Sequence, residues 1–176
     1  MNVVILSGSP RRGGNTDLLV EAFVKGASRR HEVEVISVHD YKVAPCLGCN
    51  ACFPNGGVCV QKDDMAVIYE KLKVAELLVI ASPVYFYGLS AQVKALIDRC
   101  HNPIRDTFRI RRMALLLVGA ATLPELFDSI LSQYRLCLNF FHLEDAGQVL
   151  VRGVKDRGEI AATDALQKAY DLGNSI

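Results

Sequence analysis

The sequence predicts an α/β fold in which helices cover both faces of a doubly wound parallel sheet. Five short aliphatic runs recur along the chain: Val3 to Leu6, Val33 to Val38, Leu77 to Ala81, Ala114 to Val118 and Gln148 to Val151. The first, third and fourth are apolar at every position, as strands buried on both faces of a parallel sheet must be. Helix-like stretches lie between the runs, and this alternation implies right-handed parallel crossovers.

The helices are identified by apolar stripes at helical spacing. These stripes run over residues 18–26, 65–72, 93–97, 126–138 and 165–170. Ligands of doubly wound sheets bind beyond the carboxyl ends of the strands. The functional residues are therefore expected just after the first, third and fourth strands.

Length and composition indicate one globular domain spanning residues 1–176. The chain is 51% hydrophobic and 22% charged, with a net charge of +1. This balance argues against a protein that wraps nucleic acid, because such proteins carry a lopsided charge. No apolar run reaches the roughly 18 residues that a membrane span needs. We therefore expect a cytoplasmic protein with small-molecule partners.

The loop after the first strand, residues 7–16, has the composition of an anion site. Its glycines let backbone amides turn inward, and the following helix adds the partial positive charge of its N-terminus. The side chains available to an anion are those of Ser9, Arg11, Arg12, Asn15 and Thr16. A terminal phosphate monoester, with three oxygens for many donors, fits this set best. The alternative is a plain glycine-rich turn in which Asn15 or Thr16 caps the helix.

Three other phosphate sites do not fit this loop. A nucleoside-triphosphate loop needs a Gly-Lys-Ser/Thr end, which is missing. A dinucleotide fingerprint needs three glycines at fixed offsets, whereas this loop is rich in hydroxyl and amide side chains. A phosphatase loop of this kind needs a nucleophilic cysteine, and no cysteine precedes Cys46.

The loop after the third strand contains three consecutive aromatic residues, Tyr85, Phe86 and Tyr87. Aromatic rings can stack on a flat heterocycle, and the following Gly88 admits a close approach of the backbone. These features favour a site for a planar ligand. The alternative is that the aromatic residues cover a sheet edge or a subunit contact.

Both loops resemble those of the flavodoxin-like NAD(P)H-dependent FMN reductase and iron-sulfur flavoprotein family. The resemblance rests on residues 8–11, 14–16, 82–86, 90–94 and 97–99 and covers roughly residues 1–100. It implies FMN as a noncovalent cofactor, with its phosphate on Ser9, Arg11, Asn15 and Thr16. The isoalloxazine ring would lie on Pro83, Val84, Tyr85, Phe86 and Gly88. A third flavin loop after the fourth strand would contribute Gly119 and Thr122.

The same resemblance implies a three-layer sandwich whose five-stranded parallel sheet has the order 2-1-3-4-5. It also implies a homodimer or homotetramer with the aromatic and cysteine loops near the interface.

Four of the six cysteines fall in one long loop that has no periodic pattern, and such loops are usually functional or mobile. Cys46, Cys49, Cys52 and Cys59 have the close spacing with which thiolates ligate a [4Fe-4S] cluster, and the loop resembles that of the iron-sulfur flavoproteins. A zinc site, a redox disulfide and free thiols remain alternatives. Cys100 and Cys137 lie in predicted helices at apolar spacing, so we interpret them as small buried hydrophobic residues.

Two further groups of residues carry weaker signals. Arg105, Arg109, Arg111 and Arg112 could receive the phosphate of a nicotinamide cofactor or an acidic partner, or form a solvated rim before the fourth strand. The four histidines are scattered and are interpreted as structural or surface residues.

The function predicted from these features is that of an FMN-dependent oxidoreductase. It would take electrons from NAD(P)H and pass them to a flavin, a quinone or another acceptor. Hydride transfer to a flavin needs few protein acids or bases, so no catalytic side chain is assigned. The first alternative is an electron carrier that relays single electrons between FMN, a [4Fe-4S] cluster and partner proteins. The second is a flavin-binding regulatory module without turnover.

Overall fold

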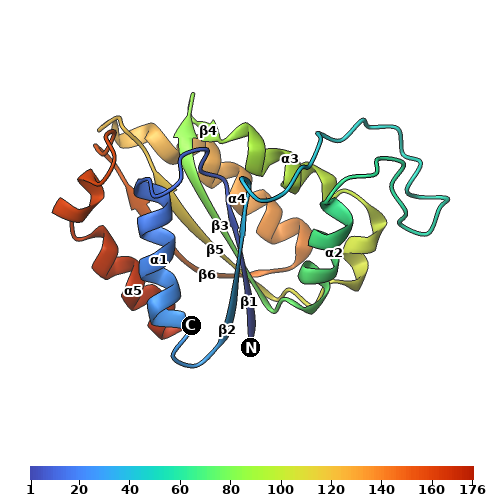
Figure 1. Cartoon of the computed structure of the whole chain (residues 1–176), viewed down its shortest axis with the longest axis horizontal. Coiled ribbons are helices and arrows are strands. Elements are labelled where there is room, and N and C mark those ends of the chain that lie inside the picture. The colour runs from blue at the N-terminus through green and yellow to red at the C-terminus, as the bar shows by residue number, and fades with distance from the viewer.

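The computed structural model describes all residues, 1–176, and shows a parallel sheet between two layers of helices (Figure 1). Five parallel strands form it: β1 (Asn2–Ser7), β2 (Glu32–Ser37), β3 (Leu77–Tyr85), β5 (Arg112–Val118) and β6 (Glu144–Val151). Their spatial order is β2-β1-β3-β5-β6. Counted along the chain, this is the predicted order 2-1-3-4-5, so the flavodoxin-like prediction is confirmed.

The helices divide between the two faces of the sheet. They are α1 (Asn15–Ala27), α2 (Met65–Val74), α3 (Ala91–Arg99), α4 (Asp128–Phe141) and α5 (Ala165–Ser175). On one face, α1 and α5 pack with the sheet in a core that includes Phe23, Val79 and Ala169. On the other face, a second core joins α2, α3 and α4 to the sheet through residues such as Ile68, Leu96 and Ile130.

The two helix layers differ in how closely they pack. Helices α1 and α5 meet at two glycines, because a Cβ on Gly26 would lie 2.2 Å from the Tyr170 carbonyl oxygen and one on Gly173 would lie 2.2 Å from that of Phe23. Backbone contact of this kind leaves no space between the helices. On the opposite face, α3 and α4 stand apart and enclose a cavity, described below.

The structure adds elements that the strand–helix pattern did not indicate. β3 runs four residues beyond the predicted end at Ala81, and a short strand, β4 (Gly88–Leu89), pairs with it antiparallel. Three 3-10 helices occupy connections: η1 (Pro103–Thr107), η2 (Pro124–Phe127) and η3 (Glu159–Ala162). None of the helices has the length and apolarity that a bilayer span requires.

Candidate functional site

Four segments at the carboxyl ends of β1, β3, β5 and β6 line a cavity of about 110 Å³. Predicted site residues line it from two of these segments: Ser9, Arg11, Asn15, Thr16, Pro83, Val84 and Tyr85. They come together because β1 and β3 are neighbours in register, with Ser7 opposite Ala81 and the Gly8 amide donating to the Ala81 carbonyl at 2.8 Å. The structure thus brings together the predicted phosphate loop and the first half of the predicted ring loop.

The phosphate loop presents an uncapped helix end to the cavity. Helix α1 begins at Asn15, and the residue before it, Gly14, offers no side chain to cap the first turn. Asp17 instead turns back and accepts from the Gly13 amide at 2.7 Å. The Ser9 hydroxyl holds the bend by donating to the Arg11 carbonyl and accepting from the Arg11 amide. The first amides of α1 are therefore free to donate to an anion.

Another wall of the cavity comes from the segment after β6. Asn15 fastens this segment, since its side chain donates to the Asp156 carbonyl at 2.8 Å and accepts from the Gly158 amide at 2.9 Å. Glu159 orders the same turn by accepting from the amides of Lys155 and Asp156, which lowers the pKa of its carboxyl. The observed role of Asn15 is therefore to join two loops.

Sequence reasoning missed the wall formed by the segment after β6. Val154, Lys155 and Arg157 line the cavity. A signal was present: the segment directly after the last strand contains three basic residues within six positions, Arg152, Lys155 and Arg157. The carboxyl ends of all strands in a parallel sheet lie at the same edge. The segment after the last strand could therefore be expected to line the site as much as the loops after the other strands.

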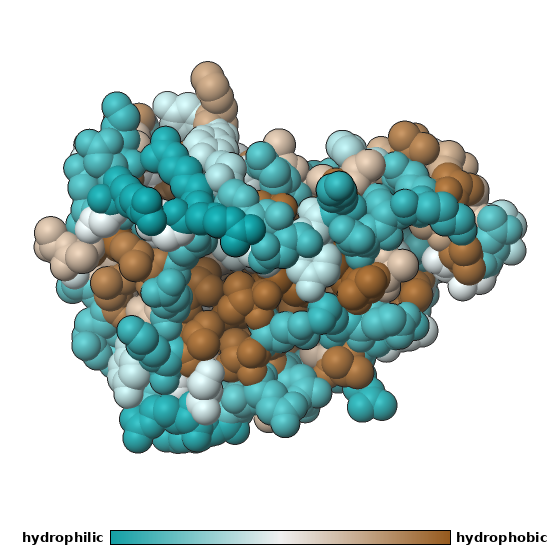
Figure 2. Space-filling model, in the orientation of Figure 1, coloured by the Kyte–Doolittle hydropathy of each residue, from teal (hydrophilic) through white to brown (hydrophobic).

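The cavity is lined by three cations and no carboxylate. Arg11, Lys155 and Arg157 contribute the positive charges. Arg11 also donates to the Lys155 carbonyl at 3.3 Å, and Arg157 donates to the Gly13 carbonyl at 2.9 Å. Figure 2 shows that the surface above α1 is strongly hydrophilic. Three cations beside an uncapped helix N-terminus form a donor set that suits a phosphate monoester.

The aromatic residues form a tight hairpin between β3 and β4. Val84 pairs with Leu89 and Tyr85 with Gly88, and both turn residues, Phe86 and Tyr87, have positive φ angles of 48° and 62°. Left-handed backbone at two consecutive residues is the geometry of a type I′ hairpin turn, in which asparagine and glycine are the usual residues. Bulky aromatic residues strain the backbone in such a turn. Backbone strain of this kind clusters at functional sites.

The structure does not bring every predicted ring-site residue into the cavity. The side chain of Phe86 is fully exposed at the tip of the hairpin, and Gly88 does not line the cavity. After β5, Ala120 lines the cavity in place of Gly119 and Thr122. Gly119 is buried, and a Cβ there would lie 2.5 Å from the Leu126 side chain, so its small size serves packing.

A buried hydroxyl connects the phosphate loop to the hairpin. Ser90 caps α3, donates to the Gly8 carbonyl at 2.7 Å, and receives the Val93 amide. Its own amide donates to the Ser82 hydroxyl at 2.9 Å. A Cβ on Gly8 would lie 2.6 Å from the Ser90 hydroxyl, so only glycine allows this approach. The relative position of the two loops is thereby fixed.

The cysteine loop projects beside α2 and α3 (Figure 1). All four predicted cysteines line one shallow hollow of about 30 Å³, together with Arg99 and no carboxylate. Cys46 and Cys49 are exposed, whereas Cys52 and Cys59 are half-buried. All six cysteines of the chain are free thiols in the structure.

One buried arginine anchors both ends of this loop. The Arg99 side chain, 2% exposed, forms an ion pair with Asp63 at 2.7 Å and donates to the Ala44 carbonyl at 3.0 Å. It also donates to the Cys59 sulfur at 3.4 Å. Burial alone would raise the pKa of Asp63, but hydrogen bonds from Arg99, Ala44 and Met65 outweigh it, so this pKa lies below its ordinary value.

Thiols dominate the donor set of the hollow, since four cysteines line it and no carboxylate does. No three histidine, cysteine or carboxylate side chains converge closely enough to hold one metal ion. A four-iron cluster binds each thiolate through a different iron, so its ligands stand further apart than those of tetrahedral zinc. The Arg99 guanidinium donates a hydrogen bond to the Cys59 sulfur, while its charge is balanced by Asp63. Four thiols are the ligand type of a [4Fe-4S] group, so the residues present are compatible with one.

The sequence profile of the NADPH-dependent FMN reductase family matches residues 1–145. The chain belongs to this family. The matched range includes the phosphate loop, the cysteine loop and the aromatic hairpin.

Curated relatives include several iron-sulfur flavoproteins. The chain is 46% identical over 112 residues to iron-sulfur flavoprotein MJ1083 of Methanocaldococcus jannaschii, covering 63% of this chain and 57% of that protein. An Archaeoglobus fulgidus iron-sulfur flavoprotein is 36% identical over 182 residues, covering 100% of this chain and 79% of that protein. The chain thus spans little more than half the length of the first of these relatives.

Solved structures share the fold at low sequence identity. An NAD(P)H:quinone oxidoreductase from Methanothermobacter marburgensis superposes with a TM-score of 0.78 at 17% identity, covering 99% of this chain and 96% of that one. An FMN-dependent NADH-azoreductase from Bacillus anthracis, in complex with FMN, gives a TM-score of 0.68 at 15% identity and covers 99% and 97% of the two chains. These similarities establish the flavodoxin-like architecture.

Proposed function

We propose that this chain binds FMN and uses it to pass electrons from NAD(P)H to a flavin, a quinone or another acceptor. The observation that carries the proposal is the single cavity in which an uncapped helix N-terminus, three cations and the Pro83–Tyr85 segment meet. Family membership supports the same assignment. FMN, when bound, supplies the hydride-accepting ring.

The residues of the chain would bind and orient this cofactor. Arg11, Lys155 and Arg157 would hold the phosphate, with amides from the first turn of α1. Pro83, Val84 and Tyr85 would lie against the ring, where apolar and aromatic contacts keep water from one side. Since Ser90 fixes the hairpin to the phosphate loop, both ends of the cofactor would be held at a set separation.

Two neighbouring arginines provide the experiment that tests the proposal. Arg11 lines the cavity, whereas the adjacent Arg12 lies outside it and pairs with Asp40 at 2.8 Å on the surface. Arg11→Gln is expected to weaken FMN binding about tenfold or more, since hydrogen bonds to charged groups contribute about 1.5–3 kcal/mol. Arg12→Gln should leave FMN binding unchanged. Equal effects of the two variants would contradict the site.

Turnover is tested on the FMN-loaded protein without oxygen. NADH or NADPH is expected to remove the flavin absorbance, and a quinone or free flavin is expected to restore it. Tight FMN binding without reduction by either nicotinamide would contradict the oxidoreductase and favour a flavin-binding regulatory module.

A second candidate function is an electron carrier in which the cysteine loop holds a [4Fe-4S] cluster. The specific observation in its favour is that Cys46, Cys49, Cys52 and Cys59 line one hollow beside the Arg99 guanidinium. The cluster, when bound, would supply one-electron transfer. Anaerobically purified protein should then contain iron and acid-labile sulfide in equal amounts. Protein that contains zinc, or neither iron nor sulfide after anaerobic reconstitution, would contradict this candidate.

A further inference from the structure

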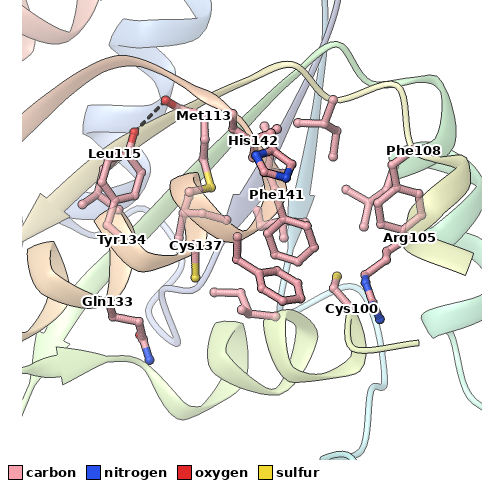
Figure 3. A pocket seen from close by; sticks show the side chains of 18 of the residues that line it. Cys100, Arg105, Phe108, Met113, Leu115, Gln133, Tyr134, Cys137, Phe141 and His142 are labelled. Carbon is pink, nitrogen blue, oxygen red and sulfur yellow. Dashed lines mark hydrogen bonds between the residues drawn. The ribbon is translucent and has the colours of Figure 1, made fainter. Parts of the chain in front are cut away.

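A large apolar cavity lies between α3 and α4, on the loosely packed face of the sheet (Figure 3). Its volume is about 390 Å³, and 17 of its 22 lining residues are hydrophobic. Leu6, Ile80 and Leu115 of the central strands form the floor. The cavity shares no lining residue with the phosphate cavity or with the cysteine hollow, so it is a separate feature of the molecule.

The size of this cavity is that of a ligand site. Protein interiors pack to nearly crystalline density and contain few voids larger than a water molecule. Pockets that take small molecules begin at roughly 300 Å³ and are lined mainly by apolar and aromatic side chains. The α3–α4 cavity meets both criteria.

The interior of the cavity is electrically neutral. Burial raises the pKa of the Cys100 thiol to about 12, and burial also raises that of the Tyr134 hydroxyl. The Tyr134 hydroxyl already has partners, the Met113 carbonyl at 2.6 Å and the Asp145 carboxylate at 2.8 Å. Figure 3 shows aromatic and sulfur-containing side chains gathered around the space. Such a lining suits a hydrocarbon and disfavours sugars or phosphates.

The mouth of the cavity carries excess positive charge. The lining residues that reach solvent come from η1, the segment just before β5 and the end of α4, and their charged members are Arg105, Asp106 and Arg111. The Arg105 guanidinium lies over the Phe140 ring, 5.7 Å from its centroid. Asp106 is 3.7 Å from Arg105 but is itself 77% exposed, and Arg111 forms no ion pair. Both arginines belong to the basic run that the flavin site leaves unused.

We propose that the α3–α4 cavity binds a linear monocarboxylate of the fatty-acid class, with its chain against Leu6, Ile80 and Leu115 and its carboxylate at Arg105 and Arg111. A neutral apolar interior with a cationic rim matches a molecule that has one apolar chain and one anionic end. Arginine presents several donors that match the planar geometry of a carboxylate. This site does not depend on the flavin proposal, because the two share no residue.

The experiment uses the full chain and a fluorescent probe, dansyl-labelled undecanoic acid. Saturable enhancement of dansyl fluorescence is expected, and dodecanoate should displace the probe at a concentration about tenfold lower than dodecanol does. Arg111→Gln should weaken dodecanoate binding about tenfold and leave dodecanol binding unchanged. Arg109 is exposed in the same basic run but does not line the cavity, so Arg109→Gln is the matched control.

A second pair of variants tests the location of the site. Cys137 lines the cavity, whereas its neighbour Leu136 is 67% exposed on the outer side of α4. Cys137→Phe should abolish displacement by both dodecanoate and dodecanol, and Leu136→Phe should leave both unchanged. Circular dichroism and the unfolding midpoint establish that both variants are folded.

Four results would overturn the proposal. They are the absence of probe binding, equal affinity for dodecanoate and dodecanol, and equal effects of Arg109→Gln and Arg111→Gln. The fourth is a dimer at assay concentrations, detected by sedimentation, that excludes both the probe and dodecanoate from the cavity.

Discussion

The two loops that would hold cofactors are built in opposite ways, although they lie at the same end of the sheet. The phosphate loop is buried at Gly8, Ser9 and Gly14 and is fastened to two neighbouring segments, the hairpin and the turn after β6. In the cysteine loop, Gly57 is the single buried residue between Cys46 and Val60. The first loop is preformed by its neighbours, whereas the second depends on a few anchors from the end of α3.

Three residues at the end of α3 and just after it, Arg99, His101 and Asn102, anchor the cysteine loop. Arg99 joins its two ends through Asp63 and the Ala44 carbonyl. The Asn102 side chain donates to the buried Gly57 carbonyl at 2.7 Å, and the rings of His101 and Phe53 lie 5.4 Å apart. A loop with so little burial owes its conformation to these contacts, so loss of one anchor should have large effects.

The largest expected effect is that of Arg99→Met. Removing one partner of a buried ion pair leaves the other charge without compensation, which typically costs about 3–5 kcal/mol. Urea unfolding should show a loss of this order in the free energy of unfolding. Lys94→Met is the matched control, because Lys94 lies on the same helix in an exposed pair with Asp98 and should cost less than about 1 kcal/mol.

The double variant Arg99→Met/Asp63→Leu separates charge from packing. Its unfolding free energy should recover part of the loss, since no unpaired carboxylate remains. Similar losses for Arg99→Met and Lys94→Met would show that Arg99 does not anchor the loop.

A smaller loss of stability is expected where Asn15 connects the phosphate loop to the turn after β6. Asn15→Ala removes the side chain that joins this loop to the turn after β6 and leaves the Asp156 carbonyl and Gly158 amide without their partner. The expected loss is about 1–3 kcal/mol in the free energy of unfolding, with weaker FMN binding. The exposed Asn55 of the cysteine loop connects no two segments through its side chain. Asn55→Ala should therefore leave the free energy of unfolding and the FMN affinity unchanged.

The stabilising contribution of the ion pair between Asp63 and Arg99 should also depend on pH. Because the pKa of Asp63 in the folded protein lies below its ordinary value of 3.8, its stabilising contribution is complete above that value and is lost as the pH falls further. The difference in unfolding free energy between the wild type and Asp63→Asn should therefore be constant near neutral pH and shrink below about pH 4. A difference that stays constant down to pH 2 would contradict the ion pair.

Local pattern was sufficient to predict the order of elements along the chain and the walls of the phosphate cavity that follow β1 and β3. Continuous apolar runs such as Val3–Leu6 identify buried strands, and loops after adjacent strands must meet. The role of Arg99 was not predictable, since its partner Asp63 is 36 positions away and nothing in the local pattern distinguishes it from other helical arginines. The wall after β6, which includes Lys155, depends on a contact with Asn15 across more than 140 positions.

The aromatic hairpin shows a different limit of prediction from the sequence. Its three aromatic residues predicted a ring-binding segment, and the structure places Tyr85 at the cavity but Phe86 at the exposed tip. The reason is the alternation of side chains along a strand that extends beyond its predicted end and then turns. Sequence reasoning treated the segment as a loop, in which all three rings could face one ligand.

The smallest expected effect is therefore that of Phe86→Ala. Its side chain is fully exposed and does not line the cavity, so FMN affinity should stay the same and the unfolding free energy should change by less than about 0.5 kcal/mol. Tyr85→Ala should weaken FMN binding, as measured by quenching of flavin fluorescence. A larger loss of affinity in Phe86→Ala than in Tyr85→Ala would contradict the assignment of these two residues.

The central claim is that a preformed cationic cavity at the carboxyl ends of the strands recognises the phosphate of FMN. Calorimetric titration of the purified chain with FMN and with riboflavin tests it most directly, because the two ligands differ only in the phosphate. FMN should bind about a hundredfold tighter or more, in line with two or more charge-assisted hydrogen bonds. Equal affinities, or no binding of FMN, would contradict the claim.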